Sequence, residues 1–140
     1  MADDTADRWD AVEEASELLL LGQDKLALVM LKRVIADDPA NHYAYYYIGV
    51  TMQQLDQKEA ARDAYRAAVK LSPGYLAARI ALSHALRELN YLDGAITQAL
   101  EGLERFPNDG DLLNVLGAMA PDEAERRKIL VDNPTRLYFE

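Results

Sequence analysis

The chain has 140 residues, half of them hydrophobic, and carries a formal net charge of −9 from 24 acidic and 15 basic residues. This length suits one domain with a buried core, and the acidity argues against a nucleic-acid partner because no basic stripe is present to neutralise phosphates. The chain contains no cysteine, which excludes disulfides, thiolate metal sites and thiol nucleophiles and fits a reducing compartment.

The N-terminal residues 1–4 read Met-Ala-Asp-Asp and lack the basic and then apolar layout of a signal peptide. Farther along the chain, no window approaches the roughly 20 uninterrupted apolar residues that a membrane-spanning helix needs. We therefore expect a cytoplasmic protein with no membrane partner.

Apolar residues recur along the chain with the spacing of amphipathic helices, as at Ile48, Met52 and Leu55, and strand-like alternation is absent. The predicted fold class is therefore all-α. The pattern predicts four successive pairs of helices, at residues 6–21 and 24–36, 41–55 and 58–71, 75–89 and 92–105, and 109–119 and 122–132.

Three sets of residues recur every 34 positions and mark the same places in successive helix pairs. The prolines of one set stop the second helix of each pair, because proline lacks the amide donor and disfavours helix in the residue before it. A second set tolerates the left-handed conformation that closes a helix, and a third set of alanines lets two helices approach closely. The sets are Pro39, Pro73 and Pro107; Gly22, Asp56 and Asn90; and Ala27, Ala61 and Ala95.

Residues 42–75 resemble one unit of the tetratricopeptide-repeat (TPR) family, whose 34-residue pattern combines aromatic, small and proline positions. The resemblance implies a right-handed superhelical stack of antiparallel helix hairpins, called an α-solenoid. It also implies a protein that binds other proteins. The matching residues are Tyr45, Ile48, Gly49, Met52, Ala61, Tyr65, Ala68 and Pro73.

The neighbouring units resemble the TPR pattern less fully. One carries Arg79 at the aromatic column and Ala99 where a second aromatic residue is usual, and the pattern shortens after Pro107. We predict a single TPR domain over 1–140, with repeats at about 8–41, 42–75 and 76–109 and a truncated repeat with a tail at 110–140.

In a TPR solenoid, the first helix of every pair lines a concave surface, which is the usual ligand site. Aromatic residues there offer large rigid contact area, and an arginine offers a directional hydrogen-bonding fork. An alternative role for the tyrosines is packing between hairpins, which we favour for Tyr45. The predicted groove residues are Trp9, Val12, Tyr43, Tyr46, Val50, Ile80, His84, Arg87 and Asn114.

One TPR subclass grips the C-terminal carboxylate of a heat-shock protein with lysines, asparagines and an arginine on the inward columns. The residues at those columns here are Val12, Ser16, Tyr47, Ala77 and Ala81. A carboxylate would find no cationic clamp among them, so we do not expect this partner.

Catalytic signals are sparse. His42 and His84 are the only residues with an ordinary pKa near neutrality, and neither has a metal-ligand partner at helical spacing. No phosphate-binding, dinucleotide-binding or serine-nucleophile motif occurs. We expect no enzyme, no cofactor and no metal, although the tail from Asp122 to Tyr138 resembles the closing helix of metal-dependent amidohydrolases.

The predicted function is that of an adaptor or scaffold, which binds a peptide or helix of another protein in its concave groove. Two alternatives stay open. One is a self-assembling homo-oligomeric scaffold, in which the apolar tail from Leu137 to Phe139 docks on a neighbouring copy. The other is a non-catalytic piece associated with an amidohydrolase-like enzyme.

Overall fold

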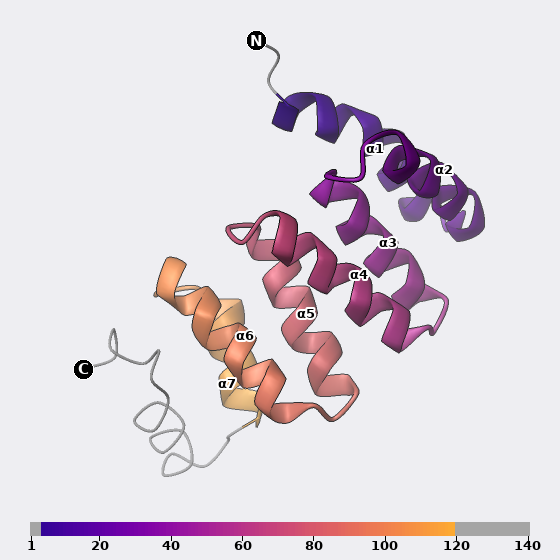
Figure 1. The fold of residues 1–140 in the computed structure, drawn as a ribbon. Helices are drawn as coiled ribbons and strands as arrows, with labels where there is room; N and C mark the ends of the chain where they lie inside the picture. Colours follow the sequence, from indigo (N-terminus) through magenta and orange to yellow (C-terminus); the bar gives the residue numbers. More distant parts are fainter. Residues whose placement is uncertain (1–3, 120–140) are drawn as a thin grey trace. The chain divides into compact units, whose positions relative to one another are not determined.

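The computed structural model describes residues 4–119, and this part of the chain is all-α (Figure 1). The helices confirm the predicted pairs to within about three residues at each end, and the predicted helix at 122–132 lies outside the described residues. The described helices are α1 (Asp4–Leu20), α2 (Asp24–Asp37), α3 (His42–Gln54), α4 (Lys58–Leu71), α5 (Leu76–Glu88), α6 (Leu92–Arg105) and α7 (Gly110–Met119).

The turn inside each helix pair has one left-handed residue, as the sequence predicts. The φ angles are 75° at Gly22, 59° at Asp56 and 66° at Asn90. In each turn, the amide of the residue that follows the left-handed residue donates a hydrogen bond to a carbonyl in the last turn of the preceding helix. These three hydrogen bonds are 2.9, 2.7 and 2.8 Å long. This is the pattern of a Schellman helix cap, which satisfies carbonyls that would otherwise lack donors.

The second helix of each of the three complete pairs that the structure describes ends two residues before a proline. Asp38, Ser72 and Phe106 adopt φ values of −140°, −140° and −130° with positive ψ, as expected of residues that precede proline. Each of the three amides still donates to the carbonyl four residues earlier. The prolines therefore fix the positions at which α2, α4 and α6 end.

The contacts divide the chain into two compact units between Ala78 and Arg79, inside α5. Unit 1 holds α1 to α4 and the start of α5, and unit 2 holds the rest of α5 with α6 and α7. The predicted division into 34-residue repeats and the single domain over 1–140 stay predictions. None of the described helices is both long and apolar enough to cross a membrane.

In unit 1, α1 packs against α2 and α3, and α3 packs against α4. The core between α1, α2 and α3 consists of fully buried small and aliphatic residues, which partly buried side chains surround. The fully buried members are Val12, Ala15, Leu31 and Ala44.

Close packing of α3 on α4 depends on a glycine. A Cβ atom at Gly49 would collide with the ring of Tyr65, which is 2% exposed and donates a 2.8 Å hydrogen bond from Oη to Gln53 Oε1. The small residue at this column therefore makes room for the aromatic ring across the hairpin.

In unit 2, Arg79 is buried at the column where the TPR pattern has an aromatic residue. Its Nη1 atom lies 3.3 Å from Gln98 Oε1 and 3.3 Å from Glu101 Oε2. Because a buried charge is tolerated only with polar partners, these residues of α6 explain how an arginine can replace the ring. Its aliphatic stem lies beside Gly102.

Candidate partner-binding surface

Aromatic side chains gather in unit 1, and we call them the aromatic cluster. Centroid distances are 5.6 Å for Trp9–Tyr43, 5.4 Å for Tyr43–Tyr75, 5.3 Å for Tyr46–Tyr75 and 5.1 Å for Tyr46–Tyr47. These four pairs meet edge to face, the arrangement that the ring quadrupole favours. The members of the cluster are Trp9, His42, Tyr43, Tyr46, Tyr47, Tyr65 and Tyr75.

The cluster forms because of helical spacing on α3. Tyr43, Tyr46 and Tyr47 are three and four residues apart, so they share one face of the helix. Trp9 reaches this face from α1, and Tyr75 reaches it from the turn that precedes α5. Side chains far apart in the sequence therefore hold each other in place.

The cluster is packed and yet remains accessible. Trp9 is 37% exposed, while Tyr43, Tyr46, Tyr47 and Tyr75 are partly buried. The tyrosines therefore pack between elements and also present area to solvent, so the two roles considered for them are compatible. Tyr45 is likewise only partly buried.

The cluster is uncharged at neutral pH. Burial raises the pKa of Tyr46, Tyr47 and Tyr75, so their phenols keep their protons. Burial, reinforced by the charge of Arg8, lowers the pKa of His42, and Asp38 opposes this shift only in part. The surface thus offers neutral rings and hydroxyl groups.

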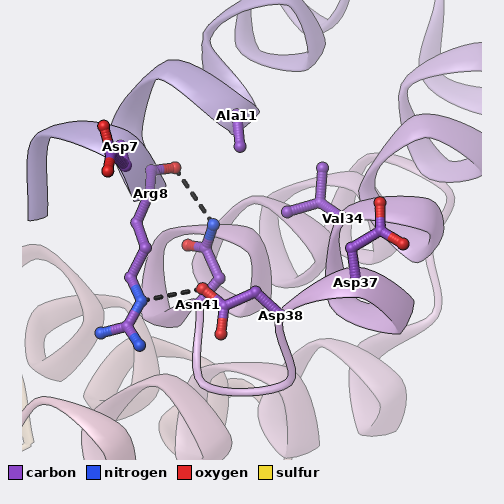
Figure 2. A pocket seen from close by; sticks show the side chains of 7 residues that line it. All are labelled: Asp7, Arg8, Ala11, Val34, Asp37, Asp38 and Asn41. Carbon is purple, nitrogen blue, oxygen red and sulfur yellow. Dashed lines mark hydrogen bonds and ion pairs between the residues drawn. The ribbon is translucent and has the colours of Figure 1, made fainter. Parts of the chain in front are cut away.

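Polar contacts, which we call the polar bracket, join Arg8 of α1 to Asp38 and Asn41 in the turn between α2 and α3 (Figure 2). Arg8 Nε lies 2.9 Å from Asp38 Oδ2, and Asn41 Nδ2 donates to the Arg8 carbonyl at 3.1 Å. Asn41 Oδ1 also accepts from the amide of Ala44 at 3.2 Å, which caps α3. The Arg8 hydrogen bond is the main cause of a lowered pKa at Asp38.

This bracket borders a pocket of about 410 Å³, and Figure 2 shows its lining side chains. Sequence reasoning missed the pocket and the bracket. The available signal was Asn41, a favoured cap residue directly before a predicted helix. The lining residues are Asp7, Arg8, Ala11, Val34, Asp37, Asp38 and Asn41.

The structure places three predicted groove residues of unit 1 in the cluster, namely Trp9, Tyr43 and Tyr46. Val50 is partly buried and lies one turn further along α3. Val12 is a correction to the predicted set: it is fully buried in the core with Ala15, so its side chain cannot contact a partner.

In unit 2, two predicted residues lie together. Arg87 Nη2 is 3.2 Å from His84 Nδ1, and because a guanidinium can only donate, the imidazole nitrogen accepts and the ring is neutral. Burial and the charge of Arg87 lower the His84 pKa, and Glu88 and Asp111 oppose the shift. Ile80 is partly buried and Asn114 is exposed.

The described residues contain no group of three or more histidine, aspartate or glutamate side chains placed to hold a metal ion. His42 instead lies against Tyr43, with ring centroids 4.1 Å apart. Whether the predicted residues of the two units form one continuous groove stays a prediction.

The fold and this surface define the chain as an all-α helical-repeat protein. The family model described as tetratricopeptide repeat matches residues 42–75, and the fold is that of solved TPR domains. Residues 42–75 thus match a tetratricopeptide repeat, and the seven described helices, which have the fold of solved TPR domains, are consistent with about three repeats and part of another.

Several solved structures share the fold at low sequence identity. The first TPR domain of Spaghetti (RPAP3), bound to the HSP90 peptide SRMEEVD, has a TM-score of 0.75 at 20% identity and covers 84% of this chain and 93% of its own. The Sgt2 TPR domain from Aspergillus fumigatus has a TM-score of 0.74 at 17% identity, covering 87% and 82%. MamA has a TM-score of 0.76 at 21% identity, covering 91% and 75%.

Curated relatives match shorter stretches. A 4-sulfomuconolactone hydrolase from Hydrogenophaga intermedia is 61% identical over 36 residues, which is 26% of this chain and 12% of the hydrolase. Superkiller complex protein 3 from Homo sapiens is 29% identical over 83 residues, which is 59% of this chain and 5% of that protein. The chain thus spans a small part of these relatives, and the predicted amidohydrolase-like tail lies outside the described residues.

Proposed function

We propose that this protein is an adaptor that binds a peptide or helical segment of another protein on the aromatic cluster of unit 1. The observation that carries the proposal is a preformed set of edge-to-face rings of which Trp9 is 37% exposed. Rigid aromatic side chains give large contact area at little cost in conformational entropy, and they are enriched in binding hot spots.

The TPR domain of Spaghetti supports a protein-binding role, since that domain has a similar fold and is bound to a peptide. Its HSP90 peptide does not suit this chain. Of the positions expected to form a carboxylate clamp, Val12 is in the core and Tyr47 belongs to the aromatic cluster. An aromatic and uncharged contact surface is therefore the better description of the site.

The test is capture of partners from a lysate of the source cell by the full chain and by its Tyr46→Ala variant. A specific partner should be lost in the variant while the thermal transition stays cooperative. The matched control is Tyr91→Ala, because Tyr91 is 54% exposed in unit 2 and lies outside the cluster. A partner that is retained by Tyr46→Ala and lost by Tyr91→Ala would refute the assignment.

The predicted contact of Arg87 is tested separately. If one groove runs through both units, Arg87→Ala should also weaken capture of that partner. Full retention by Arg87→Ala, together with loss by Tyr46→Ala, would restrict the site to unit 1.

Self-assembly is a second candidate, favoured by exposed leucines at the turn between α1 and α2. Leu20 is 88% exposed and Leu21 is 71% exposed, and clustered exposed apolar residues mark contact sites. Light scattering over a range of concentrations should then show a mass that rises above the monomer value in wild type and stays monomeric in Leu20→Gln/Leu21→Gln. A monomeric wild type at all concentrations would remove this candidate.

Association with an amidohydrolase-like enzyme is a third candidate, favoured by the short hydrolase matches at 61% and 63% identity. A resident metal would be the clearest sign of such an enzyme. Calorimetry with zinc is the test: stoichiometric uptake would support this candidate, and the absence of heat would count against it.

A further inference from the structure

The charge around the aromatic cluster indicates the chemistry of the partner, and this inference rests on the function proposed above. Trp9 lies on α1, where Glu13 follows one helical turn later on the same face and Glu17 follows after a second turn. Both glutamates are exposed. The accessible edge of the cluster is therefore bordered by carboxylates.

These carboxylates have no opposing ion pair in the described part of the chain. The ion pairs found there are Arg8–Asp38, Arg62–Asp63 and Arg79–Glu101. Because none of them includes Glu13 or Glu17, their negative charge remains open to a partner.

Positive charge is scarce on the same side of unit 1. Arg8 is the only basic residue of α1, and it is held by Asp38 at 2.9 Å. Helix α3 contains no aspartate, glutamate, lysine or arginine, and its His42 is neutral at physiological pH. The other basic residues of unit 1 belong to α2 and α4, the second helices of their pairs.

A basic side chain would gain two kinds of contact at this surface. It would approach the glutamates of α1 without displacing an existing ion pair, and it could lie over the faces of neutral tyrosine or tryptophan rings. An acidic segment would instead meet carboxylates of the same sign with no free cation among the cluster's neighbours on α1 and α3.

We propose that the aromatic cluster of unit 1 binds a segment of a partner protein in which lysine or arginine residues flank an apolar anchor. The apolar anchor contacts the rings of Trp9 and Tyr46, and the basic side chains face Glu13 and Glu17. This partner is opposite in charge to the acidic end of the peptide SRMEEVD bound by the Spaghetti domain.

The full chain carries its own reporter, because Trp9 is its only tryptophan and lies in the cluster. We would titrate it with three peptides of blocked ends, KKLFKK, QQLFQQ and EELFEE, which share one apolar centre and differ only in charge. The expected result is a saturable change in Trp9 fluorescence that is strongest for KKLFKK, weaker for QQLFQQ and absent for EELFEE. Added salt should weaken the KKLFKK complex because the attraction is screened.

Two matched variants test the position of the charge. Glu13→Gln should weaken binding of KKLFKK about two- to fivefold, the effect expected for one exposed charge pair. Glu14→Gln removes an equal charge from the next residue, which lies on a different face of α1, and should leave the affinity within about twofold of wild type.

The outcomes separate this inference from the proposed function. Equal binding of KKLFKK and QQLFQQ, or preference for EELFEE, would overturn the basic partner while supporting an adaptor surface. No fluorescence change with any peptide would also overturn it, and the capture experiment with Tyr46→Ala would then judge the adaptor function by itself.

Discussion

Gly49 is constrained by its neighbour across the hairpin, because a methyl group there would occupy the space of the Tyr65 ring. Gly49→Ala should therefore destabilise unit 1 by about 1–3 kcal/mol, the usual cost of overpacking a core. Thermal or urea unfolding would measure the loss. Gly94→Ala is the control, since its Cβ would lie an ordinary 3.6 Å from Leu86 Cδ1 and alanine favours a helix.

The two glycine variants should shift stability in opposite directions. A Gly49→Ala protein as stable as wild type would mean that Tyr65 can move aside at no cost. In that case the glycine would not be needed for the approach of α3 to α4.

Asn41 performs two tasks although it is a single buried side chain. Its oxygen caps α3 and its amide nitrogen holds the Arg8 carbonyl. Asn41→Ala should cost about 1–2 kcal/mol of unfolding free energy, because the cap of α3 and the hydrogen bond to the partly buried Arg8 carbonyl are both lost. Asn41→Ser keeps a capping oxygen, so its loss of unfolding free energy should be about half that of Asn41→Ala. Equal losses in the two variants would show that the cap contributes little to stability.

At the scale of the elements, the left-handed turn residues fix where each hairpin reverses. Asp56 has a φ of 59°, a conformation that costs most residues about 1–2 kcal/mol and glycine almost nothing. Asp56→Gly should thus be more stable than Asp56→Ala by about 1 kcal/mol in denaturant unfolding. No difference between the variants would mean that the turn relaxes out of the left-handed region.

The sequence predicts the helices well because their ends depend on local residues. Pro73 and Asp56 act on the backbone beside them, so their spacing fixes helix ends without knowledge of the fold. The prediction for Val12 was wrong because burial depends on which side of α1 meets α2. Likewise, the bracket of Arg8 on Asp38 joins residues that only the packed fold brings together.

The whole molecule should lose stability on acidification, and two kinds of group determine the direction. Burial lowers the pKa of His42 and of His84 below the ordinary 6.5. The unfolded chain therefore takes up protons at a higher pH than the folded chain does, so stability falls as pH drops below about 6.5. The pKa of Asp38 is also lowered, from 3.8, so its contribution is present above that value and is lost at still lower pH.

Melting temperatures measured between pH 7.5 and pH 5 should accordingly decrease with falling pH. In the double variant His42→Gln/His84→Gln, the histidines no longer titrate, and the decrease should be smaller across the same range. Asp38→Asn is the complementary variant, because it removes the ion pair with Arg8 and the charge that partly opposes the lowered pKa of His42, so the decrease between pH 7.5 and pH 5 should be at least as large as in wild type. A double variant with the same slope as wild type would show that neither histidine links protonation to the folding of this protein.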